Sequence, residues 1–294
     1  MGVTRRLLAA ALAVGLGGAS APVGLASAAS PIRPLAGVRT WAVYYGAAPE
    51  AAADLARFDV VVLDPRGHPP LPLVKRHGSL VLAYVSLGEV NTSHPEFAPI
   101  AGEPWVLSAN PRWPDARGLD VRAPAYERWL LERVVPAALA GPINGLFLDT
   151  ADSALELERR DPRRYDGTAR ALERVVVELR RRYPRALLLL NGGLPLAERL
   201  ARVVDAVALE SVWTDYDFET GSYRVRPAAE AELRADLLAR VTALGLPAFT
   251  LEYAPAGGDP VWPTELIRRA RARGFVPYVC TIGLDRVDLH TLSP

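Results

Sequence analysis

The chain has 294 residues, of which 50% are hydrophobic, and its 34 Lys and Arg against 33 Asp and Glu give a net charge of +1. This length can form a large core, since one (β/α)8 barrel takes about 250 residues. The balanced charge provides no general attraction for nucleic acid, so we expect no nucleic-acid partner. The single cysteine, Cys280, excludes an intrachain disulfide and a cysteine-based zinc site.

The first 28 residues have the pattern of a signal peptide. The basic pair Arg5-Arg6 precedes an apolar stretch at 7–14, and Ala26-Ser27-Ala28 resembles a cleavage site. Paired arginines are also found in twin-arginine signals, so either general or twin-arginine export fits. The apolar stretch is short for a membrane anchor. We therefore expect a secreted, periplasmic or cell-envelope protein without stable membrane insertion after signal cleavage.

Eight apolar or β-branched runs alternate with helical patterns through the rest of the chain. The expected strands lie at 40–45, 58–63, 79–87, 143–148, 186–190, 205–209, 248–251 and 275–282. The expected helices lie at 49–57, 124–139, 165–183, 194–203, 227–244 and 262–273. This alternation predicts an α/β fold, a single-domain (β/α)8 TIM barrel at 38–294 after a linker at 29–37. A doubly wound open sheet is the alternative, but no G-x-G-x-x-G pattern follows the first strand.

The second to seventh expected strands each end at a polar side chain. In chain order these residues are Asp64, Glu89, Asp149, Asn191, Glu210 and Glu252. All such strand ends converge on one face of a barrel, where the active sites of barrel enzymes lie. Acids gathered there repel one another and lose hydration, so the fold alone has little reason to collect them. For any single acid, an arginine pair or a helix cap remains an alternative.

Asp149 and Glu210 end the fourth and sixth strands, across part of the rim from each other. Two such carboxylates can cleave a glycosidic bond, one stabilising the transition state and the other protonating the leaving oxygen. A long insertion at 90–121 adds aromatic residues, and many others lie near the same rim. The rim aromatics are Trp41, Tyr44, Tyr45, Tyr84, Trp105, Trp113, Trp213, Tyr216 and Tyr253. Aromatic rings stack on sugar faces, although each taken singly could equally belong to the core.

The sequence indicates no metal and no cofactor. Its four histidines show neither H-x-x-x-H nor H-E-x-x-H spacing. The acids after the fourth strand, Asp149 and Asp152, are too close together to form an ordinary calcium loop. No G-x-S-x-G pattern supports a serine nucleophile.

The ordered set of strand-end motifs resembles glycoside hydrolase family 114, the endo-α-1,4-polygalactosaminidase-like barrels, over about 40–282. The matching segments are Tyr84–Glu89, Trp105 with Asn110 and Trp113-Pro114, Leu119–Val121, Gly145–Asp149, Asn191–Gly193, Glu210–Trp213 and Glu252-Tyr253. The resemblance implies a secreted glycoside hydrolase that cleaves galactosamine-containing polysaccharide with retention. It implies that Asp149 is the nucleophile and Glu210 the acid/base.

The resemblance also assigns substrate-binding positions along the cleft. These are Asp64, Tyr84, Glu89, Trp105, Asn191, Trp213, Glu252 and Tyr253. A non-catalytic, secreted sugar-binding barrel is the rival hypothesis, because rim aromatics would serve it equally well. A processing enzyme within an export complex for envelope polymers keeps the same chemistry in another context. The pair of acids separates catalysis from binding, since a pure binder needs no two carboxylates at catalytic distance.

Overall fold

The computed structural model describes residues 34–110, 113–259 and 261–292, which belong to one compact unit, Arg33–Pro294. The predicted signal peptide at 1–28 lies outside the described residues. Of the predicted linker, residues 34–37 form a turn in which Leu35 is fully buried. No helix in the described part of the chain is long and apolar enough to cross a membrane.

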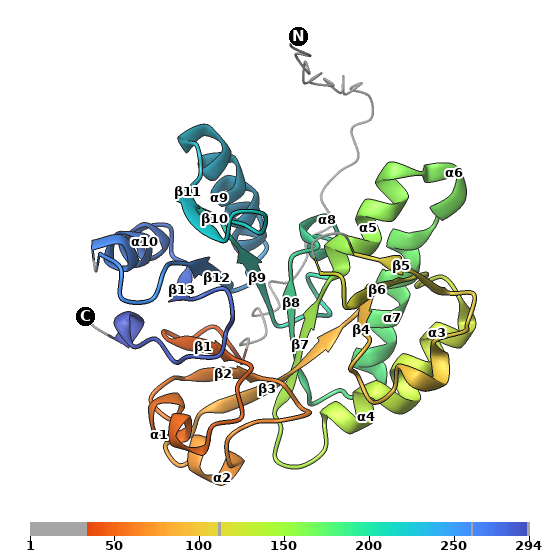
Figure 1. Ribbon diagram of the computed structural model, residues 1–294, viewed down its shortest axis with the longest axis horizontal. Coiled ribbons are helices and arrows are strands. Elements are labelled where there is room, and N and C mark those ends of the chain that lie inside the picture. The colour runs from red at the N-terminus through yellow and green to blue at the C-terminus, as the bar shows by residue number, and fades with distance from the viewer. Residues whose placement is uncertain (1–33, 111–112, 260, 293–294) are drawn as a thin grey trace, which may run out of the picture. The chain divides into compact units, whose positions relative to one another are not determined.

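Eight parallel strands form one sheet in the order β1-β2-β3-β7-β8-β9-β12-β13 (Figure 1). Their bounds are β1 Trp41–Tyr44, β2 Val60–Leu63, β3 Leu80–Ser86, β7 Gly145–Asp149, β8 Leu187–Asn191, β9 Ala206–Glu210, β12 Ala248–Tyr253 and β13 Val276–Cys280. The first and last strands, β1 and β13, contact each other, so the sheet is a nearly closed barrel. The predicted (β/α)8 fold is confirmed, and the open-sheet alternative is wrong.

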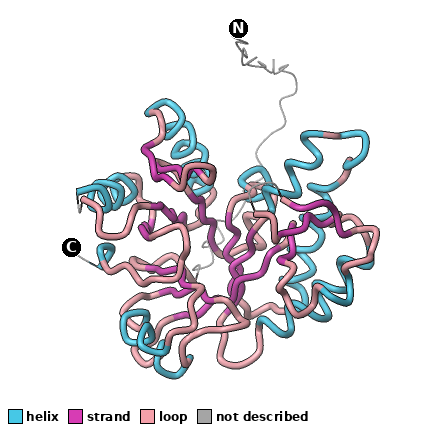
Figure 2. The backbone as a smooth tube through the Cα atoms, in the orientation of Figure 1, coloured by secondary structure: helices cyan, strands magenta, loops and turns pink. Residues whose placement is uncertain are grey.

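Helices connect the strands and surround them, as Figure 2 shows. Their bounds are α1 Ala52–Leu55, α2 Leu71–Val74, α3 Pro124–Trp129, α4 Val135–Ala138, α5 Ala151–Arg160, α6 Pro162–Tyr165, α7 Thr168–Arg182, α8 Leu194–Ala197, α9 Ala228–Ala243 and α10 Val261–Ala272. Shorter turns are η1 Pro49–Ala51, η2 Ala98–Ile100, the π-helical η3 Leu130–Val134 and η4 His290–Leu292. Sequence periodicity missed α2, α5 and α6 and extended α8 to residue 203, because short helices carry few periods.

Side chains alternate between the barrel interior and the helical layer, and this alternation aims the site. On β7, Leu146 and Leu148 pack outward with the helices, whereas Phe147 lies inside against Trp41. Trp41 fills the interior further through an edge contact with Phe249, their ring centroids 5.2 Å apart. Since successive strand residues face opposite sides, Asp149 has the same direction as Phe147 and points into the mouth of the barrel.

Two insertions follow strands at the carboxyl end of the barrel. The first, after β3, is a three-stranded antiparallel sheet made of β4 Glu89–Asn91, β5 Val106–Ala109 and β6 Ala116–Leu119. The second, after β9, is the hairpin of β10 Thr214–Asp217 and β11 Ser222–Val225. The long loop expected at 90–121 thus contains a three-stranded sheet, and the second insertion carried no sequence signal that we used.

Candidate active site

Asp149 and Glu210 meet in the mouth of the barrel through a shared partner, Asn191. The Asn191 side-chain nitrogen donates to Asp149 Oδ1 at 2.8 Å and to Glu210 Oε1 at 2.6 Å. These two oxygens are therefore no farther apart than the two hydrogen bonds laid end to end. Because Asp149, Asn191 and Glu210 end β7, β8 and β9, neighbouring strands in the sheet, the amide lies between the acids by construction.

Two tyrosines hold the outer oxygens of the same carboxylates. Tyr84 donates to Asp149 Oδ2 at 3.0 Å, and Tyr253 donates to Glu210 Oε2 at 2.5 Å. Burial, together with the neighbouring carboxylate charge, raises the pKa of both tyrosine hydroxyls well above the ordinary value, so they remain donors. Each acid is thus fixed at both oxygens, which gives the pair a defined geometry.

The electrostatics of the pair separates the roles of the two acids. Burial, followed by the charge of Asp149, raises the pKa of Glu210 to about 7. Burial also raises the pKa of Asp149, while hydrogen bonds from Asn191 and Tyr84 oppose that rise. Among the described residues neither acid forms an ion pair with arginine or lysine. Two close carboxylates without a cation share one proton at neutral pH, and Glu210 is its better site.

Each of these strand ends is followed at once by a residue in the left-handed backbone region. Thr150 has φ 61°, Gly192 has φ 66° and Ser211 has φ 53°. Threonine and serine seldom adopt this conformation, so surrounding contacts must hold it. The Thr150 hydroxyl accepts from the Gly88 N–H at 2.8 Å, and the Ser211 carbonyl accepts from Arg226 and Arg234 side chains.

Comparison with known families assigns the chain to one of them. The profile of glycoside-hydrolase family GH114 matches residues 23–292. The chain belongs to family GH114. It is therefore a glycoside hydrolase, as the sequence motifs predicted.

Solved GH114-like structures agree with the barrel described above. The glycoside hydrolase domain of PelA from Pseudomonas aeruginosa has 30% sequence identity and a TM-score of 0.74, covering 85% of this chain and 98% of that one. A variant of the same PelA domain gives 31% identity, a TM-score of 0.73 and the same coverages, 85% and 98%. Aspergillus fumigatus Ega3, crystallised in complex with galactosamine, is 14% identical with a TM-score of 0.66, covering 87% of this chain and 96% of its own. Comparison with curated proteins gives no match.

Glu252 was expected to bind substrate, but its side chain points away from the mouth of the barrel that holds Asp149 and Glu210. Its carboxylate is 0% exposed and accepts hydrogen bonds from the backbone N–H groups of Val212, Trp213 and Thr214 and from the Thr214 hydroxyl. The expectation is corrected, because Glu252 faces outward from β12 whereas the next residue, Tyr253, faces the site. Burial raises the pKa of Glu252 to about 7. The residue anchors the segment that follows Glu210.

Two predicted sugar-stacking tryptophans are also core residues. Trp105 is 4% exposed and packs on Tyr126 and Trp129, and Trp213 is 1% exposed and packs on Phe275. The expectation that they stack on substrate is corrected, because their rings are covered. They support the two insertions from beneath.

The remaining predicted acids, Asp64 and Glu89, form no hydrogen bond with the central pair among the described residues and have partners of their own. Arg66 donates from Nε to Asp64 Oδ1 at 2.9 Å and from Nη2 to Asp64 Oδ2 at 2.6 Å. Burial alone would raise the pKa of Asp64, but this bidentate ion pair with Arg66 lowers it. Glu89 is buried and accepts from the Asn110 side chain at 2.8 Å. Tyr45, predicted as a rim aromatic but not as a substrate-binding residue, packs against Tyr84, and its pKa is raised by burial and by the charges of Asp149, Glu210 and Asp64. Its position directly after β1 is the sequence signal that could have identified it as a site residue.

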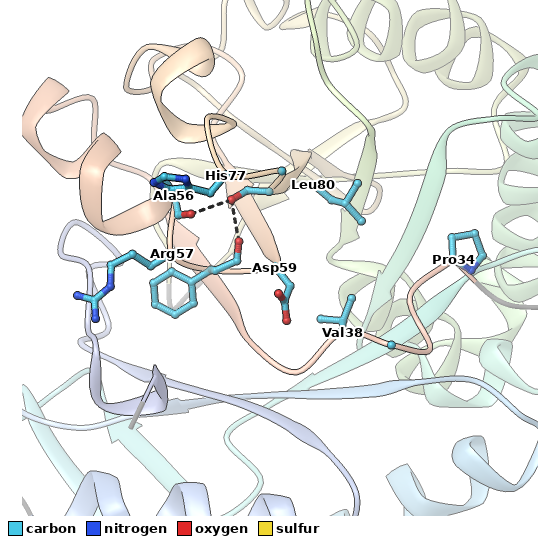
Figure 3. Close-up of a pocket in the computed structure, with 11 residues that line it drawn as sticks. Pro34, Val38, Ala56, Arg57, Asp59, His77 and Leu80 are labelled. Carbon is cyan, nitrogen blue, oxygen red and sulfur yellow. Dashed lines mark hydrogen bonds between the residues drawn. The ribbon is translucent and has the colours of Figure 1, made fainter. Parts of the chain in front are cut away.

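A cavity of about 510 Å³ lies at the opposite end of the barrel, where β1, β2 and β3 begin (Figure 3). Its polar groups are engaged within the fold. Asp59 accepts from the N–H groups of Arg39 and Thr40, and the Ser79 hydroxyl donates to the Phe58 carbonyl. Within the described residues no three His, Cys, Asp or Glu side chains come together as a metal site.

Proposed function

We propose that this GH114 chain is a secreted hydrolase of α-1,4-linked, galactosamine-containing polysaccharide that works with retention of configuration. The single observation that carries the proposal is the shared Asn191 amide, which holds Asp149 and Glu210 side by side at 2.8 and 2.6 Å. Retaining glycosidases place their carboxyl groups about 5–5.5 Å apart, whereas inverting enzymes need about 6.5–9.5 Å to admit a water. The pair in this barrel supports the shorter arrangement.

In the first step Asp149 attacks the anomeric carbon and forms a glycosyl ester. The glycosidic C–O bond breaks at the same time, and Glu210 gives its proton to the leaving oxygen. In the second step Glu210, now ionised, takes a proton from water as that water attacks the anomeric carbon. The ester bond to Asp149 breaks, which restores both side chains.

The electrostatic state at neutral pH supports these roles. The pKa of Glu210 is raised to about 7, so at neutral pH a large share of the molecules keeps a proton on Glu210, and this share grows as the pH falls. Asp149 accepts hydrogen bonds from Tyr84 and Asn191, which stabilise its ionised form. Tyr84 and Asn191 are therefore positioned to bind the reacting sugar and orient the nucleophile.

The substrate class rests on chemistry and on relatives together. A protonated sugar amine is attracted to the carboxylates near the cleft, among them Asp64 and Glu89. Ega3, which shares the fold, was crystallised with galactosamine. Secretion rests on the signal-like pattern at residues 1–28.

The test is release of reducing ends from a partially deacetylated α-1,4-galactosamine polymer by the wild type and by Asp149→Asn. We expect the variant to lose at least about 10³-fold in rate while keeping the wild-type melting curve, since Asn preserves shape and removes the charge. NMR of the first-formed anomer would give the stereochemistry. Equal release by both proteins would reject Asp149. Binding of the polymer without release by the wild type would favour the sugar-binding barrel.

A further inference from the structure

Two aromatic side chains remain exposed at the rim and touch each other. Trp113, in the turn before β6, is 50% exposed, and Phe218, in the turn after β10, is 42% exposed. Their ring centroids are 4.9 Å apart in an edge-to-face arrangement. Trp113 belongs to the insertion after β3 and Phe218 to the insertion after β9, so this contact joins the two insertions.

The contact ends a row of aromatic rings. Phe218 contacts Tyr216 at 5.0 Å between centroids, and Tyr216 contacts Tyr223 at 4.9 Å. The Tyr223 hydroxyl accepts from the Ile282 N–H, just beyond β13. The row therefore begins in the hairpin after β9, makes a hydrogen bond to the segment after β13 and contacts the insertion after β3. Three such points around one rim place the row over the mouth that holds Asp149 and Glu210.

The two parts of this row are fixed to different degrees. The body of the hairpin is braced, because Arg224 pairs with Asp215 and Asp217 and Arg226 pairs with Asp215. Its base is anchored where Thr214 binds Glu252. The meeting of Trp113 with Phe218 is by contrast an edge contact between two half-exposed rings, an arrangement that can open without disturbing the hairpin.

We propose that Trp113 and Phe218 form an aromatic clasp that grips a sugar chain as it leaves the cleft and so determines the preference for polymer over short fragments. The inference rests on the proposed function, which supplies the chain. Sugar rings stack on aromatic faces, and the clasp brings together two half-exposed rings, one from each insertion. On this proposal a fragment bound only beside Asp149 and Glu210 makes no contact with the clasp.

The test uses Trp113→Ala, Phe218→Ala and the double variant, with Val225→Ala as a matched control. Val225 is an exposed apolar residue on the same hairpin but outside the row. Affinity for the galactosamine polymer is measured by calorimetry in the Asp149→Asn background. Steady-state rates are measured on polymer and on short oligosaccharides in the active background.

We expect each single variant to weaken polymer binding about 3- to 10-fold. The same variants should raise KM for polymer with kcat nearly unchanged, and should leave short oligosaccharides unaffected. The double variant should lose less than the product of the single losses, because the two rings act as one unit. Val225→Ala should match the wild type.

Equal losses on polymer and short fragments would overturn the clasp, as would strictly multiplicative losses or none. Failure of the proposed function looks different. If the wild type released no reducing ends but polymer binding still depended on Trp113 and Phe218, hydrolysis of this polymer would be refuted and the clasp upheld. If the protein neither cleaved nor bound the polymer, both inferences would fall.

Discussion

The two ends of the barrel use acidic side chains in opposite ways. Where strands begin, Asp205 accepts from the Leu188 N–H at 2.8 Å and from Arg180 at 2.6 Å, and the Asn144 side chain accepts from Val81 N–H and from Lys75. Each of these two side chains accepts one hydrogen bond from a backbone N–H group and another from a cationic side chain. Where strands end, Asp149 and Glu210 face each other instead, joined by a neutral amide.

The difference teaches where to look for chemistry in such a fold. Charges at the beginning of the strands are neutralised, so they stabilise the barrel and do little else. At the other end Asp149 and Glu210 are held close together without a cation, which raises the pKa of both acids and costs stability, whereas Asp64 nearby is paired with Arg66. Acids with a raised pKa and no cationic partner indicate the candidate site at the carboxyl ends of the strands, whereas the cavity lies at the other end of the barrel.

Removing the proton donor should give the largest effect on turnover after loss of the nucleophile. Because the pKa of Glu210 is raised to about 7, the group is protonated below that pH, and kcat/KM should fall as pH rises through about 7. Glu210→Gln should lower kcat about 10²- to 10⁴-fold and abolish this alkaline limb. An aryl galactosaminide with a good leaving group should recover the first step. An unchanged alkaline limb in the variant would assign the proton to another residue.

Substitution of the buried residue Glu252 should have a moderate effect on the free energy of unfolding. Glu252→Gln replaces one acceptor oxygen with a donor facing backbone N–H groups, so the free energy of unfolding should fall by about 1–3 kcal/mol. Since the folded-state pKa of Glu252 is raised to about 7, the wild type loses stability as pH rises from about 4.5 towards 7, and the difference between the two proteins should narrow over that range.

Urea unfolding at several pH values measures this effect, with Glu219→Gln on the exposed hairpin turn as the control. If Glu252→Gln were as stable as the wild type and only bound polymer more weakly, Glu252 would contact substrate, as its sequence position suggested.

A change at the beginning of the strands should leave activity untouched. Asp205→Asn removes the charge that binds Arg180, so unfolding should cost about 1–2 kcal/mol less while kcat/KM of the folded enzyme stays at the wild-type value. Glu178→Gln, which breaks an exposed pair on α7, should leave the free energy of unfolding nearly unchanged, because solvent screens that pair. A fall in turnover for Asp205→Asn would erase the proposed division between the two ends.

Much of the barrel was readable because its strands are short apolar runs that alternate with helical periods. All eight predicted strands are present, and residues such as Asp149, Asn191 and Glu210 end strands as predicted. The β10–β11 hairpin was missed because Thr214–Asp217 contains polar residues with no apolar alternation. Its register with Ser222–Val225 is set by pairing across a turn.

The predicted site contains errors because the sequence was not used to determine the direction in which each side chain points. Glu252 and Tyr253 are neighbours, yet the apolar residues Phe249 and Leu251 set the inward parity, and Tyr253 shares it. Counting in twos from Phe249 would have selected Tyr253 and excluded Glu252. No comparable count was possible for Trp105, which lies in an insertion whose packing depends on tertiary contacts.

The left-handed residues after Asp149, Asn191 and Glu210 turn the backbone sharply just beyond each side chain. The direction of the side chain therefore does not depend on the segment that follows. The chain turns within one residue, and then continues as a ten-residue helix, a one-turn helix or a hairpin insertion. Three unlike continuations therefore leave from three fixed points. Loops around this mouth can be lengthened, shortened or exchanged by grafting while the carboxylates keep their aim, which makes the barrel a modular scaffold for new chain specificities.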